Sequence, residues 1–170
     1  RSLLALKTEN KIDSLAQFPF ALNEITLSRK NTTSLLSIQT TVNDEPLTTY
    51  WADGLIIATP TGSTGYSLSS GGPILTPKTA SWVLNPIAPH NINMRPLIIS
   101  DKAKLKINVS SRAKEFLVSL DSRLYSGSQD NTLYIKKASF MVNTVELEGH
   151  FFFKTLREKL FWGQDTRNTQ

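Results

Sequence analysis

The sequence predicts a mainly β fold, a multi-stranded β-sandwich with a short C-terminal helix. Two observations lead to this prediction. Most of the chain alternates between apolar and polar residues with a period of two, and the alternating stretches are short and closely spaced. Successive side chains of a strand point to opposite faces, so this alternation is typical of half-buried strands. Many short strands separated by turn residues favour a sandwich or a closed, barrel-like sheet.

The strands can be placed along the chain by this alternation. It is clearest at residues 104–109, where Leu105, Ile107 and Val109 share a face, and at residues 116–121. A continuous apolar run at 54–59 predicts a fully buried strand. A turn is expected at 43–46, which reads Asn-Asp-Glu-Pro. Further strands are expected at 3–7, 21–28, 34–42, 47–51, 132–136 and 140–147.

The C-terminal end follows a helical period instead. Within residues 151–163, Phe153, Leu156 and Leu160 fall on one face of an amphipathic helix. Gly163 stands where a glycine would cap that helix, and a polar tail follows at 164–170. The segment has more aromatic surface than one β domain needs. We therefore expect it to dock on a neighbouring α/β domain, and the alternative is that it closes the core of the sandwich itself.

Composition excludes several classes of protein. The 170 residues are 39% hydrophobic, enough for a core, and the absence of cysteine excludes disulfides, thiolate zinc sites and cysteine nucleophiles. Two isolated histidines do not make a metal site. The net charge of +5 is scattered, so we expect no nucleic-acid partner, and no apolar run approaches the roughly 20 residues of a membrane span. The chain begins within an expected strand, so we expect a fragment of a longer protein.

The most informative segment is 53–73, which contains five of the eight glycines. A buried strand runs directly into a loop rich in Gly, Ser and Thr, which offers backbone N–H groups, hydroxyls and room for a ligand close to the backbone. The loop matches neither the P-loop nor the G-x-G-x-x-G pattern. Taken alone, it has two interpretations, a nucleotide site or an ordinary turn.

This segment closely resembles the signature of NAD kinases, commonly D-G-x-x-x-x-T-P-T-G-S-T-A-Y-S. The matching residues are Asp53-Gly54 followed by T-P-T-G-S-T-G-Y-S at 59–67. Three further stretches fit in order: A-L-N-E at 21–24, P-I-A-P-H at 86–90 and R-P-L at 95–97. L-D-S-R at 120–123 falls where members have a D-G or D-S-Q turn. The resemblance covers residues 1–162.

The resemblance implies the C-terminal, NAD-binding β domain of a bacterial-type enzyme that phosphorylates the 2′-hydroxyl of the adenosine ribose of NAD. The phosphoryl donor would be ATP or polyphosphate, and the full-length enzyme would use a divalent metal, expected to be Mg²⁺. The catalytic aspartate of the family lies in a G-G-D-G-T motif that this sequence lacks. We therefore expect no catalytic residue, no metal and no activity in this chain alone, and a cytoplasmic homodimer or homotetramer for the whole enzyme.

The resemblance also implies the residues that bind NAD. Asn23 and Glu24 would contact the nucleoside, and Asp53 would receive the nicotinamide end, often in a pocket shared between subunits. His90 is a lesser candidate, expected beside the core and not at a reacting atom. The adenine and ribose pocket would be lined by Thr64, Gly65, Tyr66, Ser67, Leu68 and Ser69.

Three residues depart from the family pattern. Gly65 replaces the usual alanine, which removes a methyl group from the pocket wall. Trp51 replaces a basic residue frequent in bacterial members, which removes the charge that such a residue would provide there. Arg123 replaces a frequent glutamine and is expected to be able to reach a phosphate.

Two alternatives remain open at this point. One is the C-terminal domain of a lipid kinase of the diacylglycerol or sphingosine type, although such domains lack the T-P-T-G-S-T-x-Y-S stretch. The other is a non-catalytic β-sandwich binding module whose hydroxyl-rich loop binds a sugar or a peptide.

Overall fold

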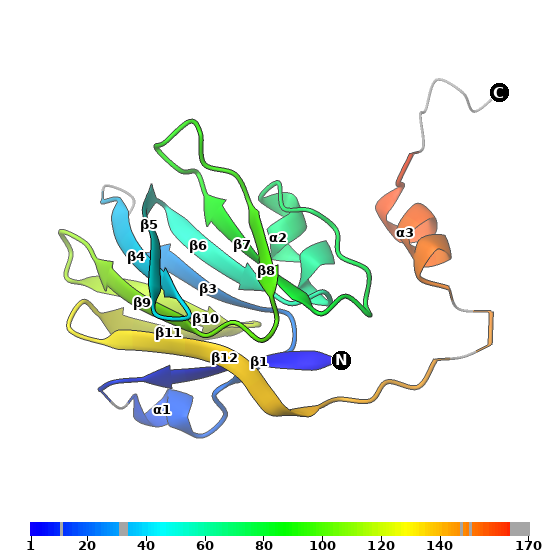
Figure 1. Ribbon diagram of the computed structural model, residues 1–170, viewed down its shortest axis with the longest axis horizontal. Coiled ribbons are helices and arrows are strands. Elements are labelled where there is room, and N and C mark those ends of the chain that lie inside the picture. The colour runs from blue at the N-terminus through cyan, green and yellow to red at the C-terminus, as the bar shows by residue number, and fades with distance from the viewer. Residues whose placement is uncertain (11, 31–33, 147, 150, 164–170) are drawn as a thin grey trace.

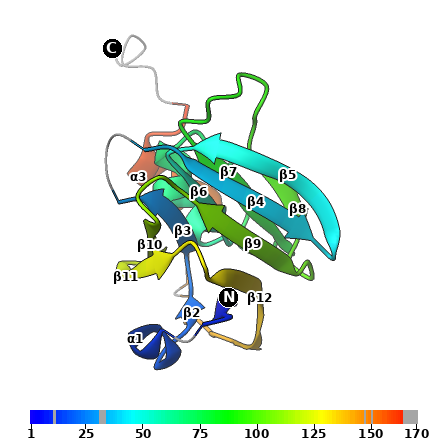
Figure 2. The ribbon, with the colours of Figure 1, turned by 90° about the vertical axis from the view of Figure 1, so that its left-hand side faces the viewer.

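Two six-stranded antiparallel sheets pack face to face, as the computed structural model shows (Figure 1, Figure 2). The structure describes residues 1–10, 12–30, 34–146, 148–149 and 151–163. The sheets have the strand orders β2-β1-β12-β9-β4-β5 and β11-β10-β3-β6-β7-β8. The predicted β-sandwich is confirmed. In chain order the elements are β1 (Ser2–Thr8), α1 (Asp13–Ala16), β2 (Phe20–Ala21), β3 (Glu24–Arg29), β4 (Leu36–Val42), β5 (Glu45–Ala52), β6 (Gly54–Ala58), η1 (Gly62–Thr64), α2 (Tyr66–Ser69), β7 (Ser81–Ile87), β8 (Leu97–Ser100), β9 (Leu105–Ser110), β10 (Glu115–Leu120), β11 (Arg123–Ser128), β12 (Thr132–Met141) and α3 (Phe152–Leu160).

The main core lies between the two sheets. Alternate residues of each strand point into it, which explains the period of two in the sequence. Leu105, Ile107 and Val109 of β9 all face inward and are buried, as predicted. Trp82 of β7 is the largest of the fully buried side chains.

Strand β6 is buried on both of its faces, which explains its continuous apolar run. Leu55 and Ile57 point into the main core. Ile56 and Ala58 belong to a second cluster on the opposite face, where Leu75 packs against them. The chain that follows β6 folds back over this outer face and covers it. The loop at 59–73, called the signature loop below, is therefore anchored to the sheet by apolar packing.

The expected strand at 21–28 is interrupted in the structure. Residues 20–21 form β2 in the first sheet and residues 24–29 form β3 in the second, so the chain crosses between sheets at Leu22-Asn23. Another crossing, at Asp53 between β5 and β6, also concerns the predicted site. A period-two pattern cannot reveal such a crossing, because the alternation is the same in either sheet.

The turn expected at 43–46 is a two-residue connection. Val42 pairs with Glu45, and both Asn43 and Asp44 have positive φ angles, of 49° and 66°. Such a turn matches the right-handed twist of the flanking strands, and Asn and Asp tolerate this conformation better than most residues.

Two expectations at the C-terminal end need correction. The strand expected at 140–147 does not form as predicted. Strand β12 ends at Met141, and residues 142–146 lie outside the sheets and are exposed. Leu147 lies outside the described residues. Helix α3 is present but ends at Leu160, and Phe161, not Gly163, is the left-handed capping residue, with φ +53°. The tail at 164–170 also lies outside the described residues.

Candidate functional site

The crossing between β2 and β3 is held by one carboxylate. Asp121, in the turn between β10 and β11, accepts hydrogen bonds from the backbone N–H groups of Leu22 at 3.0 Å, Asn23 at 2.7 Å and Glu24 at 3.3 Å. Its own N–H donates to the carbonyl of Glu24 at 3.0 Å. The backbone of residues 22–24, called the corner below, is therefore fixed at the point where the chain passes from β2 in one sheet to β3 in the other.

The signature loop is joined to this corner by Thr59. The hydroxyl of Thr59 donates to the carbonyl of Leu22 at 2.6 Å and accepts the N–H of Gly62 at 3.2 Å. Its backbone N–H donates to the carbonyl of Asn23 at 2.9 Å. Gly62 lies so close to Asn23 that a β-carbon at position 62 would overlap the backbone of Asn23. The T-P-T-G sequence is thus what allows the loop and the corner to meet.

Some hydroxyls of the loop hold its shape and do not face outward. Ser63 is buried, donates to the carbonyl of Pro60 at 2.7 Å and accepts the N–H of Leu75 at 2.9 Å. Ser67, one of the expected NAD-binding residues, is buried too, and the side-chain amide of Asn85 donates to its carbonyl at 2.9 Å. Ser67 therefore shapes the loop from beneath.

The remaining expected residues of the loop lie at its surface. Gly65, Tyr66 and Ser69 are exposed, and Thr64 and Leu68 are half-buried. Tyr66 presents about half of its surface, 47%, to solvent. An exposed aromatic ring is a surface on which a planar base can stack. This part of the predicted site is available to a ligand.

Glu24 is the unusual group of the site. Its Oε2 atom is buried and has no hydrogen-bond partner among the residues that the structure describes. Burial, and secondarily the Asp121 carboxylate, raise the pKa of Glu24 from 4.5 to about 6. A β-carbon at Gly65 would lie 3.5 Å from this oxygen, so Glu24 faces the loop. A buried acceptor without a donor costs free energy that a ligand hydroxyl would recover.

Asp53 lies at the opposite end of β6 from this corner. Glu24 pairs with Ala58, whereas Ser28 pairs with Gly54. At about 3.3 Å per residue, the two crossings are roughly 20 Å apart. One chain therefore brings Asn23, Glu24 and the loop together but does not bring Asp53 to them.

Asp53 has its own neighbours. Arg29 forms an ion pair with it at 2.9 Å, and both side chains are partly exposed. Trp51 is exposed beside a groove of about 450 Å³, and the N–H of His90 donates to the carbonyl of Trp51 at 2.8 Å. The His90 side chain is exposed and does not lie beside the core as expected. These residues form a second cluster.

Arg123 is engaged elsewhere. Its guanidinium donates to the carbonyls of Phe18, at 2.7 Å, and Phe20, and it lies over the Phe18 ring at 4.7 Å from the centroid. It therefore stabilises the segment that leads into β2, and two of its N–H groups are used there.

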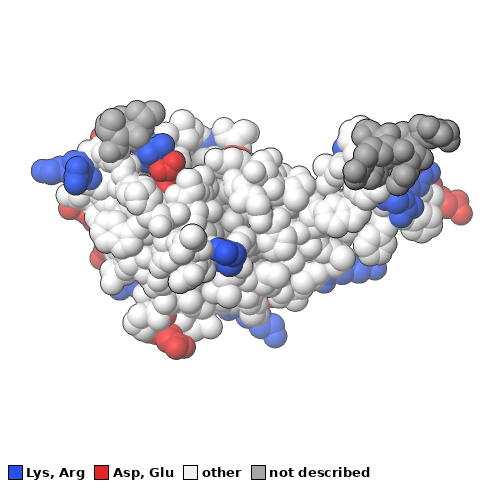
Figure 3. All heavy atoms as spheres, turned by 90° about the horizontal axis from the view of Figure 1, so that it is seen from above, with Lys and Arg blue, Asp and Glu red and all other residues white. Residues whose placement is uncertain are grey.

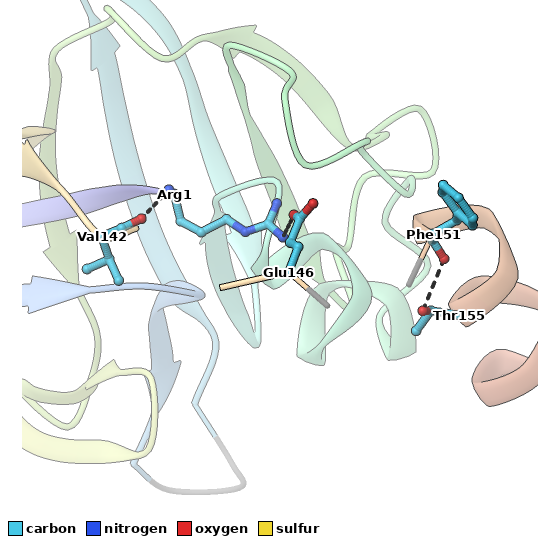
Figure 4. A network of polar contacts seen from close by, with 5 residues as sticks. All are labelled: Arg1, Val142, Glu146, Phe151 and Thr155. Atoms are coloured by element: carbon cyan, nitrogen blue, oxygen red, sulfur yellow. Dashed lines mark hydrogen bonds and ion pairs between the residues drawn. The ribbon is translucent and has the colours of Figure 1, made fainter. Parts of the chain in front are cut away.

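A groove separates the signature loop from α3. It has a volume of about 270 Å³, and Pro60, Thr61 and Thr64 face Leu156 and Leu160 across it. Leu156 is buried and Phe152 is half-buried, whereas the other aromatic residues of this segment, Phe151, Phe153, Phe161 and Trp162, are exposed. The segment leading to α3 is fixed at its start by Arg1, which contacts the carbonyl of Val142 and forms an ion pair with Glu146 at 3.5 Å (Figure 4).

The described residues offer no metal-binding cluster and no membrane-spanning helix. The face seen in Figure 3 is mostly uncharged. Among the described residues, no three His, Asp or Glu side chains cluster in a way that would hold a metal ion. No helix within that part is long and apolar enough to cross a membrane.

The sandwich with this loop is similar to a domain of known kinases that act on NAD or NADH. The family model of the ATP-NAD kinase C-terminal domain matches residues 22–147. NAD kinase from Flavobacterium psychrophilum is 55% identical over 99% of this chain, and NAD kinase from Cytophaga hutchinsonii is 44% identical over 99%. This chain covers 57% of each of those proteins. The chain belongs to the NAD kinase family and corresponds to its C-terminal domain.

Solved structures agree with this assignment. The crystal structure of yeast NADH kinase complexed with NADH has a TM-score of 0.84 and 26% identity, covering all of this chain and 52% of the yeast chain. An NAD kinase from Archaeoglobus fulgidus in complex with ATP has a TM-score of 0.68 and 26% identity, over 82% of this chain and 52% of its own. The predicted family and fold are confirmed.

Three residues important for the geometry were not among the predicted site residues. Thr59 and Gly62 belong to the T-P-T-G stretch, and Asp121 belongs to the L-D-S-R turn. All three residues lie in stretches that match the family pattern. Their partners, however, are backbone groups of residues 22–24, which are distant in sequence, so no local pattern could assign their roles.

Proposed function

We propose that this chain binds NAD and holds its adenosine ribose for phosphorylation at the 2′-hydroxyl, as part of a cytoplasmic NAD kinase that uses ATP or polyphosphate with a divalent metal ion. The observation that carries the proposal is the buried, unpartnered Oε2 of Glu24 beside the signature loop. Ribose hydroxyls are donors that suit this oxygen, and the exposed Tyr66 ring suits the adenine base.

The residues divide between two groups in this proposal. Asn23, Glu24 and the exposed loop residues contact the adenosine part of NAD, with Ser67 supporting the loop from beneath. Asp53 meets the nicotinamide end in a pocket completed by a second copy of the chain. The separation of roughly 20 Å between the two crossings supports a homodimer or homotetramer, because it puts Asp53 of one chain far from the loop of the same chain.

The phosphoryl transfer itself depends on groups outside this chain. Transfer requires the phosphates to be positioned and their charge to be stabilised. The sequence has no G-G-D-G-T, and the described residues offer no metal-binding cluster. The part of the reaction that we assign to this chain is therefore the binding and orientation of the acceptor.

Helix α3 has a separate role in the proposal. Leu156 faces the signature loop, whereas Phe151, Phe153, Phe161 and Trp162 are 56–68% exposed. Isolated exposed apolar residues are normal, but four aromatic residues within one short segment indicate a surface covered by a partner. We propose that this segment packs on the α/β domain that carries the catalytic aspartate, since the relatives are longer than this chain.

Calorimetric titration of the chain with NAD tests the proposal. Binding should be lost in Asn23→Ala and Tyr66→Ala, and it should persist in Gln39→Ala, a control at an exposed position of β4. Parallel titration with NADH is needed, because the yeast relative is an NADH kinase. If the chain bound a sugar and no dinucleotide, this would instead support a non-catalytic binding module. Phosphorylation of a lipid by a longer protein that contains this chain would support the lipid kinase alternative.

A chimera tests the whole activity. The part of the Flavobacterium psychrophilum NAD kinase that this chain does not cover would be joined to Arg1, and NADP formation would be measured with ATP. We expect the chimera to make NADP and the chain alone to make none above background. NADP formation by the chain alone would refute the assignment of the catalytic group to another segment.

A further inference from the structure

We infer that Asp121 is a positioning residue of the NAD site: its carboxylate fixes the backbone of residues 22–24 and thereby orients Asn23 and Glu24. The identity of the ligand rests on the proposed function, whereas the geometry does not. Asp121 contacts the ligand only through these two residues, so it is not itself a binding residue.

The need for Asp121 arises from the crossing between sheets. The N–H groups of residues 22–24 are partly buried, and the strand ladders cannot supply their partners where the chain leaves one sheet for the other. The carboxylate of Asp121 supplies three acceptor interactions, one from Oδ2 to Leu22 and two from Oδ1 to Asn23 and Glu24. Hydrogen bonds to an ionised acceptor are stronger than those to a neutral one, so the corner is held firmly.

The position of Asp121 is itself fixed. It has a left-handed conformation with φ +53°, which Asp and Asn adopt more readily than most residues. Its N–H donates to the Glu24 carbonyl at 3.0 Å, and its carbonyl accepts the Ser119 hydroxyl at 2.7 Å. Asp121 and Glu24 are thus bonded to each other through their main chains as well as through the carboxylate.

The charge of Asp121 also acts on the Glu24 side chain. Burial is the larger cause of the raised pKa of Glu24, and the negative charge of Asp121 adds to it. Removing that charge should therefore lower the pKa of Glu24. This gives the inference a readout that a purely structural residue in a turn would not affect.

The decisive variant is Asp121→Asn, because asparagine keeps the left-handed turn and nearly the same shape. Its amide oxygen can still accept hydrogen bonds from two of the three N–H groups. Its NH2 group cannot accept the third, and the negative charge is lost. We expect the Kd for NAD to rise at least tenfold, and its pH dependence near pH 6 to move to lower pH. Asp130→Asn, in the exposed turn before β12, is the matched control and should leave Kd and its pH dependence unchanged.

Two further measurements complete the test. In the chimera, Asp121→Asn should raise the KM for NAD and leave the KM for ATP unchanged. Without any ligand, the amide proton resonances of Leu22, Asn23 and Glu24 should move upfield in the variant, because hydrogen bonds to a carboxylate shift amide protons downfield.

The outcomes separate the inference from the proposed function. A wild-type chain that binds NAD, with Asp121→Asn binding equally well at every pH, overturns the inference and leaves the function standing. If the amide resonances change but the affinity for NAD does not, the inference is overturned as well, because Asp121 would then fix the corner without any effect on NAD binding. No NAD binding by the chain and no NADP from the chimera overturn the proposed function and this inference together.

Discussion

The backbone carbonyl of Asn23 occupies the space that a side chain on Gly62 would need. This contact joins the signature loop to the crossing between β2 and β3, and backbone atoms on both sides leave little freedom to move apart. We predict that Gly62→Ala lowers the free energy of unfolding by an amount near the upper end of the about 1–3 kcal/mol typical of overpacking. Urea denaturation of the chain measures it.

Gly65→Ala is the control for that substitution. A β-carbon at position 65 would have its nearest contacts at 3.3 Å from the Gly62 carbonyl and 3.5 Å from the Glu24 carboxylate. Small adjustments relieve such contacts, so the loss of stability should be clearly smaller than in Gly62→Ala. Equal losses in the two variants would contradict the close approach of Gly62 to Asn23.

Thr59 gives a second prediction, because its hydroxyl both donates and accepts a hydrogen bond at the corner. Thr59→Val keeps the shape but leaves the Leu22 carbonyl and the Gly62 N–H each without that partner. We expect a loss of about 1–3 kcal/mol in unfolding free energy, together with weaker NAD binding.

Thr40 provides the matched comparison on β4. It is also buried, but its hydroxyl has no partner among the described residues. Thr40→Val should therefore be neutral or slightly stabilising, as judged by the same urea denaturation. If both threonine variants lost equal stability, the hydroxyl bonds of Thr59 would not be the reason for its effect.

Glu24 predicts a pH-dependent difference in stability. Its pKa is about 6 in the folded chain against an ordinary 4.5, so the folded state binds the proton more tightly than the unfolded state between these values. Stability from this group is therefore fully present below pH 4.5 and is lost as the pH rises to 6. The shift corresponds to at most about 2 kcal/mol.

Glu24→Gln should reveal this effect, since the amide resembles the protonated acid. The variant should gain stability relative to the wild type as the pH rises from 4.5 to 6, and the difference should stay constant above pH 6. NAD binding at neutral pH should nevertheless weaken. Thermal unfolding of both proteins across this pH range provides the measurement, and a difference that is the same at pH 4 and pH 7 would contradict it.

The two faces of α3 should respond differently to substitution. Leu156→Ala removes a buried apolar side chain that lines the groove beside the signature loop, so it should destabilise the packing of the helix in the isolated chain. Phe153→Ala changes an exposed side chain and should leave the stability of the chain unaltered, yet reduce NADP formation by the chimera. If Phe153→Ala were without effect in the chimera, this face of α3 would not pack on the added domain.

The sequence alone predicted much of the sandwich, because alternation marks each strand that has one buried face. The strands around Leu105 and Val118 were found in this way. It missed β7, β8 and β11, and it predicted a strand at 140–147 where residues 142–146 are exposed outside the sheets. The reason is that periodicity reports which residues can face a core, and it does not report whether a neighbouring strand is present to pair with them.

The family and the candidate residues were also within reach of the sequence, because the T-P-T-G-S-T-G-Y-S stretch is long and specific. Only the tertiary structure decided how those residues are held. It placed Asn23 and Glu24 at a crossing between sheets, fixed that crossing with Asp121 from 98 residues away, and put Asp53 at the other end of β6. Hydrogen bonds between backbone and side chains so far apart depend on how the strands are ordered in the sheets, which no local pattern of residue types encodes.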